Sequence, residues 1–144
     1  GVVALSTTHR RKKIMSEMDI IIGNDLEFNI ADDSSDGIKL AKDFVNQKPS
    51  IIIYKMGEKG SKVFTKEKEL QFGVFKVNAI KPTGAGDAFN GGFISSLYNK
   101  YSLKESVIRG SANAAIVVTK VGCSSAMPDE EELERFINQQ SMEI

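Results

Sequence analysis

Two runs of consecutive isoleucines restrict what this chain can fold into more than any other feature. Residues 20–22 and 51–53 are isoleucine at every position, and Gly23 ends the first run. Uninterrupted β-branched runs are typical of strands that are buried on both faces of a parallel sheet. Apolar residues at helical spacing over residues 36–46 indicate an amphipathic helix between the two runs. With a further short apolar run at residues 2–5, this order predicts an α/β fold with helices covering a parallel sheet.

The segment after the second isoleucine run predicts a change of strand direction. Val63 and Phe64 begin a new strand almost at once, without room for a helix. Residues 69–77, interrupted by Gly73, are expected to complete a β-meander, so that antiparallel pairing lies at one edge of the sheet. The whole pattern predicts a parallel-core sheet with an antiparallel edge, flanked by helices in three α/β/α layers.

Three helices are expected in the remaining chain. One contains Ala88 and Phe89, one spans the small, apolar residues 103–118, and an acidic one follows Pro128. The second of these is apolar on most faces, which is typical of a helix that packs closely against its neighbours. Residues 140–144 are expected to fray. Nothing in the sequence indicates an internal repeat or a second domain boundary.

Composition excludes several classes of function. The 144 residues are enough for one domain with a core, and 19 basic residues balance 19 acidic ones. Without a net field, nucleic acid and membrane surfaces are not expected as partners, and no apolar run is long enough to span a bilayer. The single cysteine, Cys123, excludes an internal disulfide and favours a reducing, cytoplasmic location. Because the chain begins with Gly1 and enters a strand at once, an excised fragment is expected.

A glycine turn followed by a carboxylate is the strongest indication of function. Gly84, Ala85 and Gly86 can present successive backbone N–H groups in a tight turn, and a helix follows directly. Unpaired N–H groups and the positive end of the helix dipole make such a turn a site for an anion. Asp87, in the same turn, would repel a phosphate unless it accepts a proton from the group that attacks the phosphate.

Known glycine motifs do not explain this turn. Phe89 stands where G-x-G-x-x-G requires its third glycine, and Gly92-Phe93 stands where a P-loop requires lysine and serine or threonine. A glycine turn that only packs a helix on a sheet leaves Gly91 and Gly92 unexplained, because each costs about 1 kcal/mol inside a helix. We therefore expect a neighbouring backbone or a ligand to approach this helix closely.

Asn24 and Glu27 follow the first isoleucine strand, three residues apart. In open parallel sheets ligands bind at the carboxyl ends of strands, and both side chains can face that crevice from the first helical turn. The alternative is a capping box, in which the pair only closes the start of a helix. The spacing alone leaves both interpretations open.

The motif T-G-A-G-D-A-F at residues 83–89 resembles the C-terminal signature of the ribokinase-like (PfkB) carbohydrate kinases. Three further matches occur in the order that this family has, and together they cover residues 20–128. They are N-x-x-E at Asn24 and Glu27, K-x-G-x-x-G at Lys55, Gly57 and Gly60, and A-N-A-A at residues 112–115 followed by Gly122.

The resemblance implies a ribokinase-like fold and the ATP-dependent phosphorylation of a hydroxyl on a sugar or sugar acid. It implies that residues 1–144 form the C-terminal nucleotide-binding and catalytic part of a kinase domain about twice this length. The N-terminal half, with the lid and most of the sugar site, would be absent, so the chain alone is expected to show no turnover. Asp87 would be the general base, and the backbone amides at Gly84, Ala85, Gly86 and Asp87 would form an anion hole.

The resemblance also implies ATP and Mg²⁺ as cofactors. Asn24 and Glu27 would orient the metal ion, whereas the nucleotide would be bound by Lys55, Gly57, Gly60, Thr83, Asn113 and Gly122. Many family members have Asp-Thr where this chain has Lys81-Pro82, so dependence on a monovalent cation stays open. A homodimer of the full-length protein is also left open.

The version K-P-T-G-A-G-D is similar to the form found among 5-dehydro-2-deoxygluconokinases, which makes 5-dehydro-2-deoxygluconate the first substrate to expect. Fructose, fructose phosphate, ribose, nucleosides and vitamin precursors remain alternatives within the family. Two other classes stay open: a nucleotide-binding module without catalysis, and a dinucleotide-binding oxidoreductase. The broken G-x-G-x-x-G disfavours the oxidoreductase.

Overall fold

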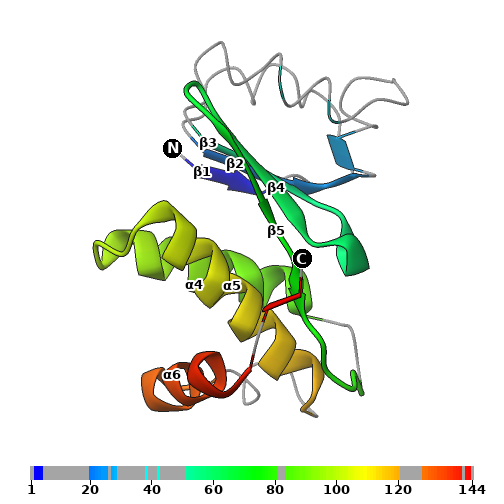
Figure 1. Cartoon of the computed structure of the whole chain (residues 1–144), viewed down its shortest axis with the longest axis vertical. Coiled ribbons are helices and arrows are strands. Elements are labelled where there is room, and N and C mark those ends of the chain that lie inside the picture. The colour runs from blue at the N-terminus through cyan, green and yellow to red at the C-terminus, as the bar shows by residue number, and fades with distance from the viewer. Residues whose placement is uncertain are drawn as a thin grey trace. The chain divides into compact units, whose positions relative to one another are not determined.

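The computed structural model describes residues 2–4, 20–25, 27–28, 38, 42, 51–80, 84–120, 128–140 and 142–143. The contacts of the chain divide it into two compact units, residues 1–73 and residues 74–143. The first unit is built around a five-stranded sheet, and the second around three helices with a two-stranded sheet (Figure 1).

The sheet of the first unit has the strand order β1-β2-β3-β4-β5. Strands β1 (Val2–Ala4), β2 (Ile20–Asn24) and β3 (Ile51–Lys55) are parallel, whereas β4 (Ser61–Thr65) and β5 (Glu69–Phe72) are antiparallel. The isoleucines of β2 and β3 lie side by side in register, and the inner two of each strand are at most 1% exposed. The mixed sheet, with a parallel core and an antiparallel edge, confirms the predicted fold class.

A short 3₁₀ turn, Gly57–Lys59, connects β3 to β4. Gly60 follows it with a φ of 87°, and a Cβ atom at this position would lie 2.0 Å from the carbonyl oxygen of Phe72. Because Ser61 and Phe72 are partners in the β4–β5 ladder, the two backbones must approach each other closely here. Gly60 is therefore required by the sheet itself.

After Gly73 the chain leaves the first sheet, so the meander expected over residues 69–77 is wrong in its second half. β6 (Val74–Phe75) instead pairs antiparallel with β7 (Met142–Glu143). The prediction that residues 140–144 fray is wrong for these two C-terminal positions. Met142 packs against the apolar cluster that contains Phe75, a contact between distant parts of the sequence that no local pattern signals.

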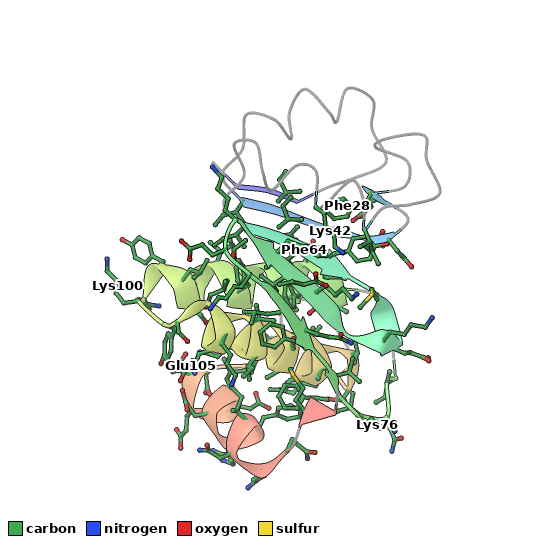
Figure 2. The ribbon with its side chains drawn as sticks, turned by 45° about the horizontal axis from the view of Figure 1, so that its top comes forward. Phe28, Lys42, Phe64, Lys76, Lys100 and Glu105 are labelled. Atoms are coloured by element: carbon green, nitrogen blue, oxygen red, sulfur yellow. The ribbon has the colours of Figure 1, made fainter. Side chains whose placement is uncertain are left out.

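The second unit contains α4 (Ala85–Tyr98), α5 (Leu103–Val118) and α6 (Glu130–Gln139). α4 and α5 lie side by side, joined by a short turn that carries Lys100 at a φ of 70° (Figures 1 and 2). On α6, Leu133 is buried and Phe136 packs edge-on against Phe75, with ring centroids 5.2 Å apart. All three predicted helices are therefore present.

Two glycines allow α4 and α5 to pack closely. A Cβ atom on Gly92 would lie 3.1 Å from the Cα atom of Gly110, and one on Gly110 would lie 2.9 Å from the carbonyl oxygen of Phe89. A neighbouring backbone thus explains Gly92, as one of the two expected alternatives. A Cβ atom on Gly91 would meet nothing within 4 Å, so packing does not explain that glycine.

Some predictions lie outside the described residues. Of the helix expected over residues 36–46, only Ile38 and Lys42 are described, and both are helical. Thr83, Lys81-Pro82 and Gly122 are not described, and the three-layer arrangement stays a prediction. No helix in the described part of the chain combines the length and the apolar character that crossing a membrane requires.

Candidate active site

The first turn of α4 leaves a set of backbone N–H groups at its open end. Gly84 precedes the helix in the left-handed conformation, with a φ of 92°. No side chain caps this helix start. The first helical bond runs from the N–H of Ala88 to the carbonyl oxygen of Gly84, at 2.9 Å. The N–H groups of Ala85, Gly86 and Asp87 precede this bond and point out of the helix end. The predicted glycine turn at a helix start is confirmed.

The starts of α5 and α6 are closed by side chains. Ser102 accepts a hydrogen bond from the N–H of Glu105 at 3.1 Å at the start of α5 (Glu105 is labelled in Figure 2). Asp129 accepts one from the N–H of Glu132 at 2.8 Å at the start of α6. Since caps satisfy the amides that an anion would otherwise bind, α4 is the described helix in unit 74–143 whose start suits an anion.

Asp87 lies in this open turn with its carboxylate exposed to solvent. The next two residues, Ala88 and Phe89, are buried and hold the turn on the rest of the unit. An exposed carboxylate next to free amides can accept a proton from a hydroxyl while the amides bind the oxygens of a phosphoryl group. The arrangement suits proton removal and anion binding in one place.

Asn113 lies on α5 against this same turn. Its side-chain amide donates a hydrogen bond to the carbonyl oxygen of Ala88 at 2.8 Å, and the residue is 8% exposed. Ala88 itself packs against Val117 and Ala114 of α5. The structure therefore gives Asn113 a contact with α4, while its predicted role beside the nucleotide stays a prediction.

In the first unit, Asn24 and Glu27 form a complete capping box. The N–H of Glu27 donates to Oδ1 of Asn24 at 2.8 Å, and the N–H of Asn24 donates to Oε2 of Glu27 at 2.7 Å. Phe28, which is fully buried, packs its ring against Tyr54 of β3 and fastens this helical turn to the sheet (Figure 2). The capping alternative is therefore correct as a description of the pair, and a role in metal binding stays a prediction.

The described donors at this end of the sheet suit a magnesium ion that keeps most of its waters. Asn24 and Lys55 are register partners at the carboxyl ends of β2 and β3, and Glu27 follows in the next turn. Among the described residues there is no group of three or more histidine, cysteine, aspartate or glutamate side chains that could hold a metal ion. A Mg²⁺ ion that keeps its waters and is bound mainly by phosphates needs one or two carboxylates, which the described residues here can supply.

Gly57 and Gly60, both assigned to the nucleotide by resemblance, differ in their surroundings. Gly57 is exposed, and a Cβ atom there would meet nothing within 4 Å. Gly60 is enclosed by the backbone of β5. The space at Gly57 is compatible with a nearby ligand, whereas the need for glycine at position 60 comes from the sheet.

Arg109 is a buried cation at the centre of a side-chain network that sequence reasoning missed. Its Nε donates to Oγ of Ser96 at 3.2 Å, its guanidinium pairs with Glu130 and Glu134, and Tyr101 lies 4.3 Å beneath it. Burial lowers the pKa of Arg109, but hydrogen bonds to the two glutamates outweigh it, so the net pKa is raised. The network joins α4, α5 and α6. In the sequence, only the four-residue spacing of Glu130 and Glu134 could have indicated that both carboxylates face one partner.

A pocket of about 620 Å³ lies beside this network, with Gly91 on its wall.

Each unit carries one set of the predicted site residues. The second unit holds Gly84, Ala85, Gly86, Asp87 and Asn113, and the first holds Asn24, Glu27, Lys55, Gly57 and Gly60. That the two sets form one site stays a prediction.

Comparison with known proteins supports one family. The model of the family described as "pfkB family carbohydrate kinase" matches residues 4–130. A 5-dehydro-2-deoxygluconokinase of Photobacterium profundum is 39% identical over 132 residues, which is 88% of this chain and 40% of that protein.

Solved structures agree with this match. A ribokinase of Thermotoga maritima superposes with a TM-score of 0.85 at 32% identity, over 96% of this chain and 49% of that one. A candidate ribokinase II of E. coli, in complex with ATP and Mg²⁺, superposes with a TM-score of 0.82 at 22% identity, over 88% of this chain and 41% of that one. The chain spans less than half the length of each of these proteins.

Proposed function

The chain belongs to the pfkB family of carbohydrate kinases, and we propose that it carries the phosphoryl-transfer part of an ATP-dependent sugar or sugar-acid kinase. The observation that carries this proposal is the uncapped start of α4, where amides without an intrahelical partner and the exposed carboxylate of Asp87 occupy one turn. The relatives are about twice as long, so the proposal concerns the full-length protein that contains this chain.

Phosphoryl transfer needs a positioned hydroxyl, a base for its proton and stabilisation of the charge on the transferring group. Asp87 accepts the proton of the attacking hydroxyl. The N–H groups of Ala85, Gly86 and Asp87, in the turn that Gly84 opens, donate to the oxygens of the transferring group. The carboxylate thus acts on the attacking hydroxyl and the amides on the transferring group, which explains why an acidic residue stands in an anion-binding turn.

ATP would supply the phosphoryl group, and Mg²⁺ would neutralise charge on its phosphates. Asn24 and Glu27, at the carboxyl end of β2, would orient the hydrated ion, in keeping with their sparse donor set. The E. coli neighbour of the same fold binds ATP and Mg²⁺. The residues proposed to bind the nucleotide are Lys55, Gly57, Gly60, Thr83 and Gly122, and the family resemblance also suggests Asn113.

The first proposed acceptor is 5-dehydro-2-deoxygluconate, supported by the 39% identity to the Photobacterium enzyme. Ribose is the second, because the Thermotoga neighbour at 32% identity is a ribokinase. Both acceptors present a hydroxyl to the same base, so the chemistry that Asp87 performs does not depend on the choice.

The test is a coupled ADP-release assay of the full-length protein. It covers 5-dehydro-2-deoxygluconate, ribose, fructose, fructose phosphate and nucleosides, each with ATP and Mg²⁺. We expect one acceptor to stimulate ADP release strongly, with the sugar acid giving the highest kcat/KM. ATP binding without release on any acceptor would contradict the proposal and favour a nucleotide-binding module. NADH binding in a fluorescence titration would favour the oxidoreductase.

A further inference from the structure

A single helix, α5, contacts the chain on both sides of the proposed catalytic turn of α4. On the entry side, the N–H of Ile80 donates to the carbonyl oxygen of Val118 at 2.7 Å. On the exit side, the Nδ2 group of Asn113 donates to the carbonyl oxygen of Ala88 at 2.8 Å. The chain between these two contacts includes Gly84, Ala85, Gly86 and Asp87. The bond to Ala88 therefore ties the first turn of α4, which carries the proposed anion hole, directly to α5.

The contact through Asn113 is buried and crowded. Asn113 is 8% exposed, and its Cβ atom lies 3.1 Å from where a Cβ atom of Gly92 would be. Ala88 has no exposed surface and packs against Val117, which is 2% exposed. In such a close interface the amide has little freedom to turn elsewhere, and the hydrogen bond fixes the first turn of α4 relative to α5.

We propose that Asn113 is a positioning residue for phosphoryl transfer, which acts by fixing the Ala88 carbonyl and with it the amides and carboxylate of the turn. The proposal rests on the proposed function. Ala88 directly follows Asp87 in the same helical turn, so a shift of Ala88 moves the base and the adjacent N–H groups together. A misplacement of about 1 Å at a reacting centre can cost on the order of 100-fold in rate.

This role differs in its kinetics from the nucleotide contact that the family resemblance suggests for Asn113. A side chain that binds ATP lowers KM for ATP, and its loss raises that KM. A side chain that positions the turn affects kcat and leaves KM for ATP nearly unchanged. The two roles therefore separate in a single experiment.

The experiment uses the full-length protein with Asn113→Leu, which keeps the branching of the side chain at Cγ and removes the donor. We expect kcat to fall about ten-fold or more while KM for ATP stays within about two-fold. Hydrogen exchange of the Ala88 N–H, which bonds to Gly84, should accelerate about ten-fold, and this readout needs no turnover. Asn113→Ala gives the same comparison without a branched side chain, should the leucine variant fail to fold.

Leu133→Ala is the control for a general loss of stability. Leu133 is buried on α6 and packs against Ala112 and Ile116 of α5, so its truncation should lower Tm without lowering kcat. An equal loss of kcat in this control would contradict the proposal. In the Asn113 variants, a raised KM for ATP with normal kcat, or unchanged kinetics, would also contradict it. Full activity of Asp87→Asn would instead refute the proposed function. Hydrogen exchange of the Ala88 N–H would then still show whether Asn113 fixes the start of α4.

Discussion

Two helical turns that carry proposed catalytic residues begin in opposite ways. The turn after β2 closes on itself, because Asn24 and Glu27 satisfy each other's backbone amides. The first turn of α4 begins at a left-handed glycine, Gly84, without a side-chain cap. α5 and α6 are closed by Ser102 and Asp129 in the ordinary way.

The difference separates what each turn can contribute to a reaction. A capped turn has used its amides for the fold, so its remaining contribution is the charge and polarity of its side chains. An uncapped turn keeps its amides for a ligand, at a cost in helix stability that binding can offset. The comparison therefore assigns the anion hole to α4 and leaves only an orienting role to Asn24 and Glu27.

The open turn should give the largest effect. Asp87→Asn keeps the shape of the side chain and removes the base, so kcat should fall about 10²- to 10⁴-fold. ATP binding, measured by calorimetry, should persist because the amides of the turn remain. Near-normal turnover would show that the open end of α4 holds no base.

The close packing behind the open turn should give the next effect. Gly110→Ala would place a Cβ atom 2.9 Å from the Phe89 carbonyl oxygen, and we expect a loss of about 1–3 kcal/mol in the free energy of unfolding. Gly91→Ala is the matched variant on α4, where nothing lies within 4 Å, and it should gain about 0.5–1 kcal/mol. Denaturant unfolding measures both, and equal effects in the two variants would contradict the close packing.

The proposed Mg²⁺ role of Glu27 can be tested without breaking the capping box that it forms with Asn24. Glu27→Gln keeps a side chain that can complete a capping box, while it removes the negative charge. Tm should stay within a few degrees, and the Mg²⁺ concentration for half-maximal activity should rise about ten-fold, as expected when one carboxylate near the ion is lost. An unshifted Mg²⁺ titration would reduce Glu27 to its capping role.

Removal of an ordinary cap should have the smallest effect. Ser102→Ala leaves the N–H of Glu105 without its partner, at a cost of about 1 kcal/mol. Thermal unfolding should shift by a few degrees, whereas kcat should not change, since this cap only stabilises α5. A loss of kcat without a loss of Tm would mean that capped helix starts also take part in catalysis.

Local patterns in the sequence predicted the parts of the fold that depend on neighbouring residues. The isoleucine runs predicted β2 and β3 because burial on both faces leaves no alternation in the sequence. The glycine turn before an apolar helical pattern predicted the start of α4. The four-residue motif at Asn24 was compatible with both a cap and a metal role, and only coordinates could show that both hydrogen bonds form.

The rest could not be predicted because it depends on which segments meet. Gly110 matters only because Phe89 of another helix lies against it. Arg109 is buried where Glu130 and Glu134 of α6 pair with it. From the sequence alone, a single arginine in a helix is expected to be exposed to solvent. The departure of β6 from the meander requires a partner near the other end of the chain.

The pairing of β6 with β7 also has a consequence for the order of folding. Val74 and Glu143 are register partners, so the first and last elements of the second unit meet only after everything between them has been closed into a loop. For a loop of this length the entropy of closure opposes the contact by about 4 kcal/mol. A two-residue ladder offsets little of this cost, so the strand also depends on the packing of Met142 against the apolar cluster that contains Phe75. The helices should therefore assemble first, and the C-terminal strand should dock last and open first.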